Sequence, residues 1–384
     1  MENNLQLATA NLYSKCKGRY LTLEVIQSFI AELSNHFTSE ISGYSVLNQP
    51  IHAVKFGTGP RKILIWSQMH GNESTSTKGL LDYLHFLNTD KEAYNEIASR
   101  FTIVVIPMLN PDGAKQYTRE NANGVDLNRD ASNCTQPESV VLRNLVTQFQ
   151  PDYCFNFHDQ RTLFGLLESK KPATISFLTA SFDESRSFNA TREAAANVIV
   201  AMHQELEKYI PGQLGRFDDS FNINCTGDYF TSLGIPTVLF EAGHYQDDYE
   251  RDEVRKFIFI ALKTAFCCIY ENVVVESCIA KYLNICENNK CFADIIFKNV
   301  NIIENNVEKI SNFAVNYKEV LFENSVKFEA IITEINCSDF LIGHQEIDAQ
   351  QKLFKASYGN IPKIGEKANF YLANSAFVNG KEIK

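Results

Sequence analysis

The stretch Arg61-Lys-Ile-Leu-Ile-Trp66-Ser-Gln-Met-His70-Gly-Asn-Glu73 joins an apolar run to two potential metal ligands. The turn signal Gly57-Thr58-Gly59-Pro60 precedes the run, and together they predict a strand over 61–69. Apolar residues at helical spacing follow from about Ser74. His70 and Glu73 therefore lie at a strand-to-helix turn, where both side chains can reach one metal ion. Zinc accepts an imidazole nitrogen and a carboxylate oxygen, and a catalytic zinc takes three protein ligands. Because a lone His-x-x-Glu pair is also common in polar loops, further ligands must be found elsewhere.

The same alternation of strand and helix patterns continues along the chain. Apolar residues at helical spacing predict a helix over 22–36, and the residues 44–56 alternate as in strands. Continuous apolar runs predict strands over 101–106, 153–158, 175–179 and 235–240, with helices over 138–149, 187–208 and 252–269. This order predicts an α/β fold with a mixed, largely parallel twisted sheet and helices on both faces.

The composition changes after about residue 275. The tail is rich in Val, Ile, Phe, Tyr and Asn, with short strand-like runs over 293–297, 327–335 and 369–372. Turn signals at Gly343, Gly359-Asn360 and Pro362 separate them. We therefore predict two domains, a catalytic domain over 1–274 and a small, mainly β domain over 275–384.

The overall charge limits the class of partner. The formal net charge of the 384 residues is −10, which argues against nucleic-acid binding because that requires a basic face. No stretch is apolar for about 18 residues, so we expect no transmembrane helix and no membrane partner. The first five residues, Met1 to Leu5, contain neither a basic nor an apolar region of a signal peptide, so we predict a cytoplasmic protein with reduced cysteines.

Polar groups suited to hydrolysis follow the other predicted strands. Asn110-Pro-Asp-Gly113 comes after the strand over 101–106, and His158-Asp159 ends the next strand. Glu241 ends the last strand of the predicted sheet. Catalytic groups in open α/β sheets gather beyond the carboxyl ends of the strands, so we expect these groups to meet His70 and Glu73.

These motifs resemble the zinc metallocarboxypeptidases of the M14 (carboxypeptidase A-like) family. The resemblance covers roughly residues 40–270, and it rests on six motifs in the order of the family: His70-x-x-Glu73, Asn110-Pro-Asp-Gly113, Arg119-x-Asn121, Gly124-Val-Asp-Leu-Asn-Arg129, His158 and Glu241. It implies one zinc ion per chain, with His70, Glu73 and His158 as ligands.

The resemblance also implies a role for each of the other motif residues. Glu241 is expected to be the general base for a zinc-activated water, and Arg119 to stabilise the oxyanion. Asn128 and Arg129 are expected to hold the free carboxylate of the substrate, which an arginine fork grips with two hydrogen bonds. Asp126 is expected to accept a hydrogen bond from the first histidine ligand and so to fix its tautomer.

The chain departs from the family where a mobile tyrosine is expected to close over the substrate. The corresponding stretch is Phe217-Asp-Asp-Ser-Phe221, which contains no tyrosine. Tyr229, Tyr245 and Tyr249 are candidate replacements, and the sequence does not choose among them. The residue that selects the substrate side chain is expected near 226–228. Six acidic residues nearby either favour a basic substrate side chain or form a solvated face: Asp218, Asp219, Asp247, Asp248, Glu250 and Asp252.

The sequence therefore predicts a zinc-dependent hydrolase that cleaves an amide bond next to a free carboxylate. A metallocarboxypeptidase acting on peptides is the first interpretation. The motifs His-Gly-Asn-Glu and Asp-Leu-Asn-Arg also resemble those of aspartoacylase and succinylglutamate desuccinylase enzymes, which end in a β domain, so an N-acyl amino acid deacylase is the alternative. A non-catalytic peptide-binding module is a third interpretation, but such a module is expected to have lost a ligand or the base.

Overall fold

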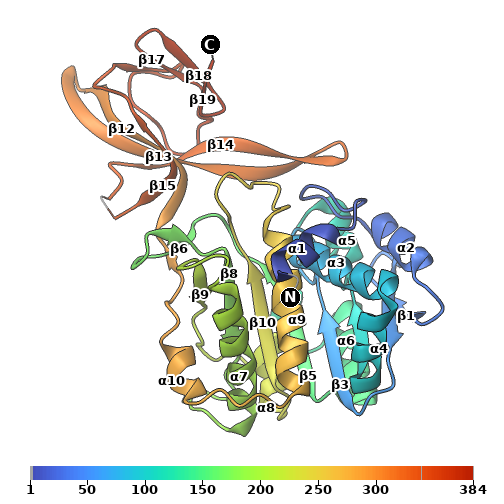
Figure 1. The fold of residues 1–384 in the computed structure, drawn as a ribbon. Coiled ribbons are helices and arrows are strands. Elements are labelled where there is room, and N and C mark those ends of the chain that lie inside the picture. Colours follow the sequence, from blue (N-terminus) through green and yellow to red (C-terminus); the bar gives the residue numbers. More distant parts are fainter. Residues whose placement is uncertain (1–2, 339, 384) are drawn as a thin grey trace. The chain divides into compact units, whose positions relative to one another are not determined.

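The computed structural model describes residues 3–338 and 340–383, which form two compact units. The first unit comprises the residues up to Gln160 together with Ala173–Asn288. The second comprises Arg161–Pro172 and the residues from Asn289 onward. Figure 1 shows the elements of both units in the colours of the sequence.

The first unit contains the central sheet and the helices around it. Its strands are β1 (Thr38–Tyr44), β2 (Pro50–Phe56), β3 (Arg61–Trp66), β4 (Phe101–Ile106), β5 (Tyr153–Asp159), β8 (Ile175–Thr179), β9 (Leu214–Arg216) and β10 (Thr237–Ala242). Its helices are α1 (Asn4–Ala10), α2 (Leu23–Glu32), α3 (Thr75–Thr89), α4 (Lys91–Arg100), α5 (Pro111–Gln116), the 3-10 helix η1 (Leu127–Arg129), α6 (Pro137–Phe149), α7 (Ala190–Leu206), α8 (Thr226–Ser232), α9 (Val254–Tyr270) and α10 (Cys278–Leu283).

The central sheet has the strand order β1-β2-β4-β3-β5-β10-β8-β9. The four neighbours β4, β3, β5 and β10 run parallel, whereas β1, β2 and β8 pair antiparallel to their inner neighbours. The parallel strands are the continuous apolar runs of the sequence, because strands covered on both faces must be apolar on both faces. The predicted mixed, largely parallel α/β fold is confirmed.

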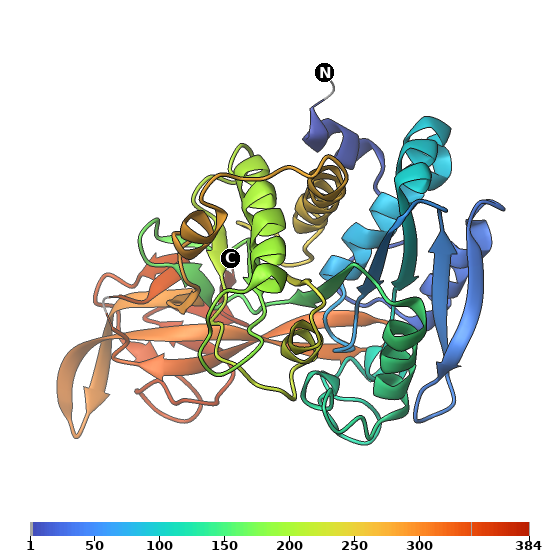
Figure 2. The same ribbon diagram turned by 90° about the horizontal axis from the view of Figure 1, so that it is seen from below.

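Two hydrophobic cores cover the two faces of this sheet. Alternate residues of β3, β4 and β5, such as Ile63, Ile103 and Phe155, pack with α3, α7 and α9 on one face. Their neighbours in the strands, such as Leu64 and Cys154, pack with α6 and α8 on the other face. Figure 2 shows these helices lying on the two sides of the sheet. His158 and Glu241 alternate with Phe157 and Phe240 of the first core, so their side chains point toward the opposite face.

The second unit is built from β strands. It contains a four-stranded sheet of order β14-β13-β12-β15, a second of order β16-β17-β18-β19 and a three-stranded sheet of order β11-β6-β7. The strands are β6 (Phe164–Leu166), β7 (Lys171–Pro172), β11 (Asn289–Lys290), β12 (Phe292–Glu304), β13 (Val307–Phe322), β14 (Ser325–Ile335), β15 (Ile342–Asp348), β16 (Phe354–Lys355), β17 (Phe370–Leu372), β18 (Ser375–Val378) and β19 (Lys381–Ile383). Its core is rich in phenylalanine, and the rings of Phe297 and Phe313 stack at 4.8 Å.

The compact units divide the chain differently from the predicted domains. Residues 275–288 belong to the first unit, because α10 packs on α7 and the hydroxyl of buried Tyr282 accepts a hydrogen bond from Thr179 N at 3.1 Å. Arg161–Pro172 belongs to the second unit, because its strand β6 pairs with β11. The change in composition at 275 therefore marks the end of α9 and not the end of the first unit. Separate folding of residues 1–274 and 275–384 stays a prediction.

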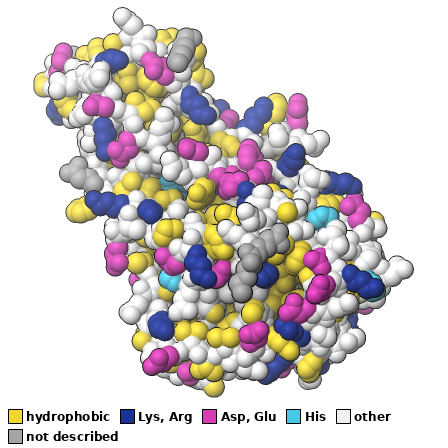
Figure 3. Space-filling view, in the orientation of Figure 1, with side chains coloured by type: hydrophobic (Ala, Val, Ile, Leu, Met, Phe, Trp, Pro, Cys, Tyr) yellow, Lys and Arg dark blue, Asp and Glu magenta, His cyan; other side chains and the backbone are white. Residues whose placement is uncertain are grey.

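Charged side chains of both signs are interspersed on the face of the molecule seen in Figure 3.

Within residues 3–338 and 340–383, no helix has the length and apolar character needed to span a bilayer.

Candidate active site

The carboxyl ends of three parallel strands, β3, β5 and β10, bring four of the predicted site residues together. His70 and Glu73 lie between β3 and α3, His158 lies near the end of β5, and Glu241 lies near the end of β10. Glu241 and His158 are register partners in the β5–β10 pair, so their side chains are neighbours on one face of the sheet. The loop between α5 and η1, together with η1 itself, supplies the remaining groups.

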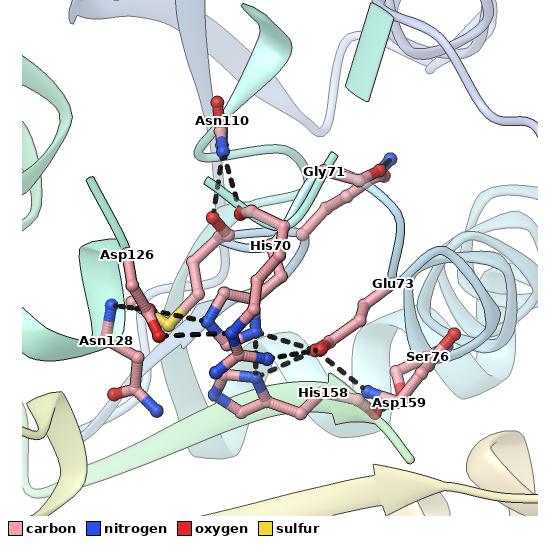
Figure 4. A network of polar contacts seen from close by, with 12 residues as sticks. His70, Gly71, Glu73, Ser76, Asn110, Asp126, Asn128, His158 and Asp159 are labelled. Carbon is pink, nitrogen blue, oxygen red and sulfur yellow. Dashed lines mark hydrogen bonds and ion pairs between the residues drawn. The ribbon is translucent and has the colours of Figure 1, made fainter. Parts of the chain in front are cut away.

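Three donor atoms converge on one point, as Figure 4 shows. His70 Nδ1 lies 2.9 Å from Glu73 Oε2, and His158 Nδ1 lies 3.0 Å from the same oxygen and 3.1 Å from His70 Nδ1. All three side chains are buried. Zinc bonds of about 2.0–2.2 Å place neighbouring ligand atoms of a tetrahedral site roughly 3.4 Å apart. Two imidazole nitrogens and one carboxylate oxygen at these separations fit zinc in chemistry and in geometry.

Glycine is required in the turn that carries His70 and Glu73. The backbone of Gly71 lies so close to Gly113 that a Cβ atom at position 71 would be 1.9 Å from the carbonyl carbon of Gly113. Asn110 ties the two loops together: its Nδ2 donates to Met69 O at 3.1 Å and its Oδ1 accepts from Gly113 N at 2.8 Å. The Asn110-Pro-Asp-Gly113 motif therefore shapes the turn that presents His70.

Asp126 contacts the other ring nitrogen of His70. Its Oδ1 lies 2.9 Å from His70 Nε2 and accepts Asn128 N at 2.8 Å. A proton on Nε2 leaves Nδ1 as the unprotonated nitrogen that faces Glu73 and His158. Burial alone would raise the pKa of Asp126, but the hydrogen bond to His70 and the charges of His70 and Arg119 hold that pKa below its usual value.

Arg119 bridges two carboxylates. Its Nη1 lies 3.0 Å from Glu73 Oε1, and its Nε lies 3.1 Å from Asp126 Oδ2. Glu73 thus turns one oxygen toward the two histidines and the other toward the guanidinium. About a third of the Arg119 side chain stays exposed (37%), so it remains open to a substrate.

Glu241 differs from Glu73 because one of its carboxyl oxygens has no hydrogen-bond partner among the described residues. This oxygen, Oε2, is buried. Burial raises the pKa of Glu241 well above its usual value, and the charges of Glu73 and Asp159 raise it further, against the lowering effect of Arg119 and Arg251. An unpaired carboxylate next to a metal site is suited to accept a proton, and the charge of a bound cation would lower its pKa.

Asn128 and Arg129 lie in η1 beside the start of α8. Asn128 Oδ1 accepts a hydrogen bond from Thr226 N at 2.9 Å. The exposed Arg129 places Nη1 3.1 Å from Cys225 Sγ and 2.7 Å from Asn128 O. A thiol and a backbone carbonyl therefore orient the guanidinium at the edge of the site, and neither group is acidic.

The structure also gives a position to the residues that the sequence left undecided. The segment of the missing tyrosine is anchored, because Asp219 pairs with buried Arg192 and its carbonyl accepts Ser181 Oγ at 2.7 Å. The three candidate tyrosines all pack against neighbouring rings: Tyr229 on Phe230, Tyr245 on Phe257 and Tyr249 on His244.

Two of the acidic residues considered for substrate selection have structural partners. Asp248 accepts the backbone N–H groups of Asp252, Glu253 and Val254 at the start of α9. Asp252 lies 2.9 Å from the Nζ of buried Lys78.

Asp159, the residue after His158, is a buried structural carboxylate and not a solvated loop residue. Asp159 is buried and accepts Thr75 N at 2.7 Å and Ser76 N at 3.0 Å at the first turn of α3. Its own N–H donates to Glu73 Oε2 at 3.2 Å. It therefore ties the strand of His158 to the helix that follows Glu73. The unsatisfied N–H groups of a helix start, just after Ser74, were the signal for such a partner.

Replacing Asp126 by asparagine should weaken zinc binding about 10- to 100-fold, the usual effect of losing the partner of a histidine ligand. Asparagine keeps the size of the side chain but removes the charge that favours a proton on His70 Nε2. Competition with a chromophoric chelator measures the affinity. Asp183→Asn, in the partly exposed bend before α7, is the control. Unchanged zinc affinity in Asp126→Asn contradicts the role of Asp126.

Comparison with known proteins supports the relation suggested by the motifs. Residues 22–174 match the family model Peptidase_M14, zinc carboxypeptidase. This range includes all the predicted site residues except Glu241. Probable carboxypeptidase 2 of Trichophyton verrucosum is 28% identical over 101 residues, which are 26% of this chain and 20% of that protein. Carboxypeptidase E of Caenorhabditis elegans is 32% identical over 112 residues, which are 23% of this chain and 24% of that protein. The chain thus spans about a fifth to a quarter of the length of these relatives.

Solved structures share the fold of the chain. The putative carboxypeptidase A of Shewanella denitrificans has a TM-score of 0.54 at 16% identity, covering 65% of this chain and 69% of that one. The metallo-carboxypeptidase of Burkholderia cenocepacia has a TM-score of 0.51 at 16% identity, covering 66% and 70%.

Proposed function

We propose that this chain, whose residues 22–174 match the zinc carboxypeptidase model Peptidase_M14, is a zinc-dependent metallocarboxypeptidase that removes C-terminal residues from peptides. The observation that carries the proposal is the convergence of His70 Nδ1, Glu73 Oε2 and His158 Nδ1, with Glu241 beside His158 in register. His70, Glu73 and His158 would hold one zinc ion. Three protein ligands leave a position for water or substrate, as in catalytic zinc sites.

The proposed reaction divides the work among the neighbouring side chains. When bound, zinc supplies a Lewis acid that brings the pKa of a water molecule to about 7 and polarises a carbonyl. Glu241 takes the proton of the attacking water on its carboxylate and passes it to the nitrogen of the leaving amine. Arg119, already oriented by Glu73 and Asp126, donates hydrogen bonds to the oxyanion that develops on the substrate.

The free carboxylate of the substrate is proposed to bind at the edge of the site. Asn128 Nδ2 and the Arg129 guanidinium offer donors there, and the contacts with Thr226 and Cys225 fix their directions. A guanidinium forms two parallel hydrogen bonds with a carboxylate, so it orients the scissile bond as well as binding the end of the chain. Peptide substrates with a free C-terminal carboxylate are therefore the proposed partners.

The substrate class is tested with zinc-loaded protein and three sets of compounds. Peptides with a free C-terminus are expected to lose their last residue, whereas the same peptides with an amidated C-terminus are expected to stay intact. N-acyl amino acids, the substrates of the alternative deacylase, form the third set. Turnover confined to the acyl amino acids would overturn the peptidase proposal. Absence of turnover in all three sets would leave the binding-module interpretation.

Replacing Arg129 by methionine should lower kcat/KM for free-carboxylate peptides about 10- to 100-fold, because a hydrogen bond to a charged group contributes roughly 1.5–3 kcal/mol. Arg129→Lys keeps the charge but loses the fork, so an intermediate value is expected. Arg61→Met, at the start of β3, is the control. Equal kinetics in wild type and Arg129→Met would show that another group binds the carboxylate.

The cytoplasmic location expected from the sequence stays a prediction. Cell fractionation with an antibody against the chain tests it.

A further inference from the structure

We propose that Arg251 is a positioning residue that fixes the relative placement of Glu241 and His158. This inference rests on the proposed function, in which both side chains act at one site. Arg251 lies ten residues after Glu241 and was not among the residues that the sequence suggested. It is fully buried at the carboxyl ends of the two strands that carry Glu241 and His158.

The guanidinium joins the two strand ends directly. Its Nη1 donates to Ala242 O at 2.5 Å, and its Nη2 donates to Gln160 O at 2.5 Å. Ala242 is the residue after Glu241, and Gln160 is the second residue after His158. Gln160 N also donates to Ala242 O at 2.9 Å. The planar fork of arginine reaches both carbonyls at once, which a single ammonium group does with less directional control.

The two hydrogen bonds of Arg251 lie at the ends of β10 and β5, so they can fix the position of one strand end relative to the other. Glu241 pairs with His158 in the parallel register of β10 and β5, and the strands carry no further paired residues beyond Ala242 and Asp159. Strand ends without ladder partners fray easily, because fewer hydrogen bonds hold them. Arg251 adds a side-chain connection just beyond the last pair, beside the hydrogen bond from Gln160 N to Ala242 O. A displacement of about 1 Å between reacting groups can cost about 10² in rate.

Gln160, one of the two residues that Arg251 holds, is itself anchored on several sides. Its Nε2 donates to Ala173 O at 2.6 Å and to Ser176 Oγ at 3.0 Å, and its Oε1 accepts Asn288 Nδ2 at 2.7 Å. Arg251 therefore connects Ala242 to a point of the fold that cannot shift easily.

Gly243, the residue after Ala242, has no room for a side chain. A Cβ atom on Gly243 would lie 2.0 Å from Ala173 O and 2.5 Å from Gln160 Nε2. Arg251 itself has φ 56°, in the left-handed region that non-glycine residues rarely adopt. Such conformations persist where the surrounding contacts dictate them, and the backbone N–H of Arg251 donates to Asp248 O at 3.2 Å.

The test compares the zinc-loaded full chain with Arg251→Met and Arg251→Lys. We expect Arg251→Met to keep one zinc per chain, to lower kcat at least tenfold and to change KM less than threefold. Arg251→Lys retains a donor and is expected to recover part of kcat. Arg100→Met, with a side chain stacked on Tyr270 at the other end of the unit, should keep the kcat of the wild type.

Several outcomes separate positioning from a merely structural role. A variant that only melts at a lower temperature, with the kcat of the wild type per zinc-loaded chain, overturns the proposal. If Arg251→Met fails to fold, wild-type kcat in Arg251→Lys also overturns it.

Hydrogen exchange tests the placement without turnover, so it remains informative if the wild-type chain cleaves no substrate and the proposed function fails. The amides of Gln160 and Gly243 should exchange at least tenfold faster in Arg251→Met, with those of β3 unchanged. Uniform change across the sheet, or no change, contradicts the inference.

Discussion

The Glu241→Gln variant is expected to bind zinc as the wild type does and to hydrolyse peptides about 10²–10⁴-fold more slowly, the usual contribution of a general base. Glutamine keeps the shape of the side chain but cannot accept the proton of the attacking water. The ligand atoms of His70, Glu73 and His158 are untouched, so the metal should remain. Peptide hydrolysis measured with the zinc content of the same sample tests both statements.

Two comparisons make the Glu241 result specific. Glu271→Gln changes an exposed carboxyl just after α9 and should keep the activity of the wild type. The KM of Glu241→Gln should stay within a few-fold of the wild-type value, because Asn128 and Arg129 still bind the substrate carboxylate. Full activity in Glu241→Gln would contradict the proposed mechanism. Loss of zinc in this variant would instead indicate that Glu241 helps to hold the metal.

The His158→Ala variant is expected to lose zinc on dialysis and with it nearly all hydrolysis. Two ligands from a single turn, His70 and Glu73, would remain, and two ligands hold zinc much less tightly than three. The loss of affinity should exceed the 10- to 100-fold expected for Asp126→Asn, since a ligand and not its partner is removed.

Thermal unfolding gives a second readout of the same change. A ligand that binds only the folded state stabilises it by about 2.7 kcal/mol at a concentration of 100 times Kd. Added zinc should therefore raise the Tm of the wild type and leave that of His158→Ala unchanged. His203→Ala, on α7 and 3.8 Å from Glu207, is the control and should respond to zinc like the wild type. A zinc-dependent Tm in His158→Ala would mean that His158 is not a ligand.

The sequence predicted the central sheet well because its signals are local. Residues 101–106 and 175–179 are strands with the predicted ends, and the predicted helix over 138–149 corresponds to α6. The helix α4 was missed, because Lys91–Arg100 is polar and has no buried residues. Its helical signal is the N-cap Asp90, whose side chain accepts from the N–H groups of Glu92 and Ala93.

The sequence by itself determined the chemistry of the candidate site. The residue types, their order and their places after apolar runs depend on the chain alone, and they predicted a His, Glu, His set that the fold brings within hydrogen-bond distance. Only the tertiary structure decided how these groups are held. Asp159 accepts hydrogen bonds from the first turn of α3. Arg251 reaches Gln160, which lies 91 positions away in the sequence, and joins it to Ala242. Such contacts form between segments that are distant in the chain, so no local sequence pattern predicts them. The stretch from Arg61 to Glu73 thus contains the strand, the turn and two proposed ligands. The positions of the proposed third ligand, His158, and of the proposed base, Glu241, depend on the register between β5 and β10.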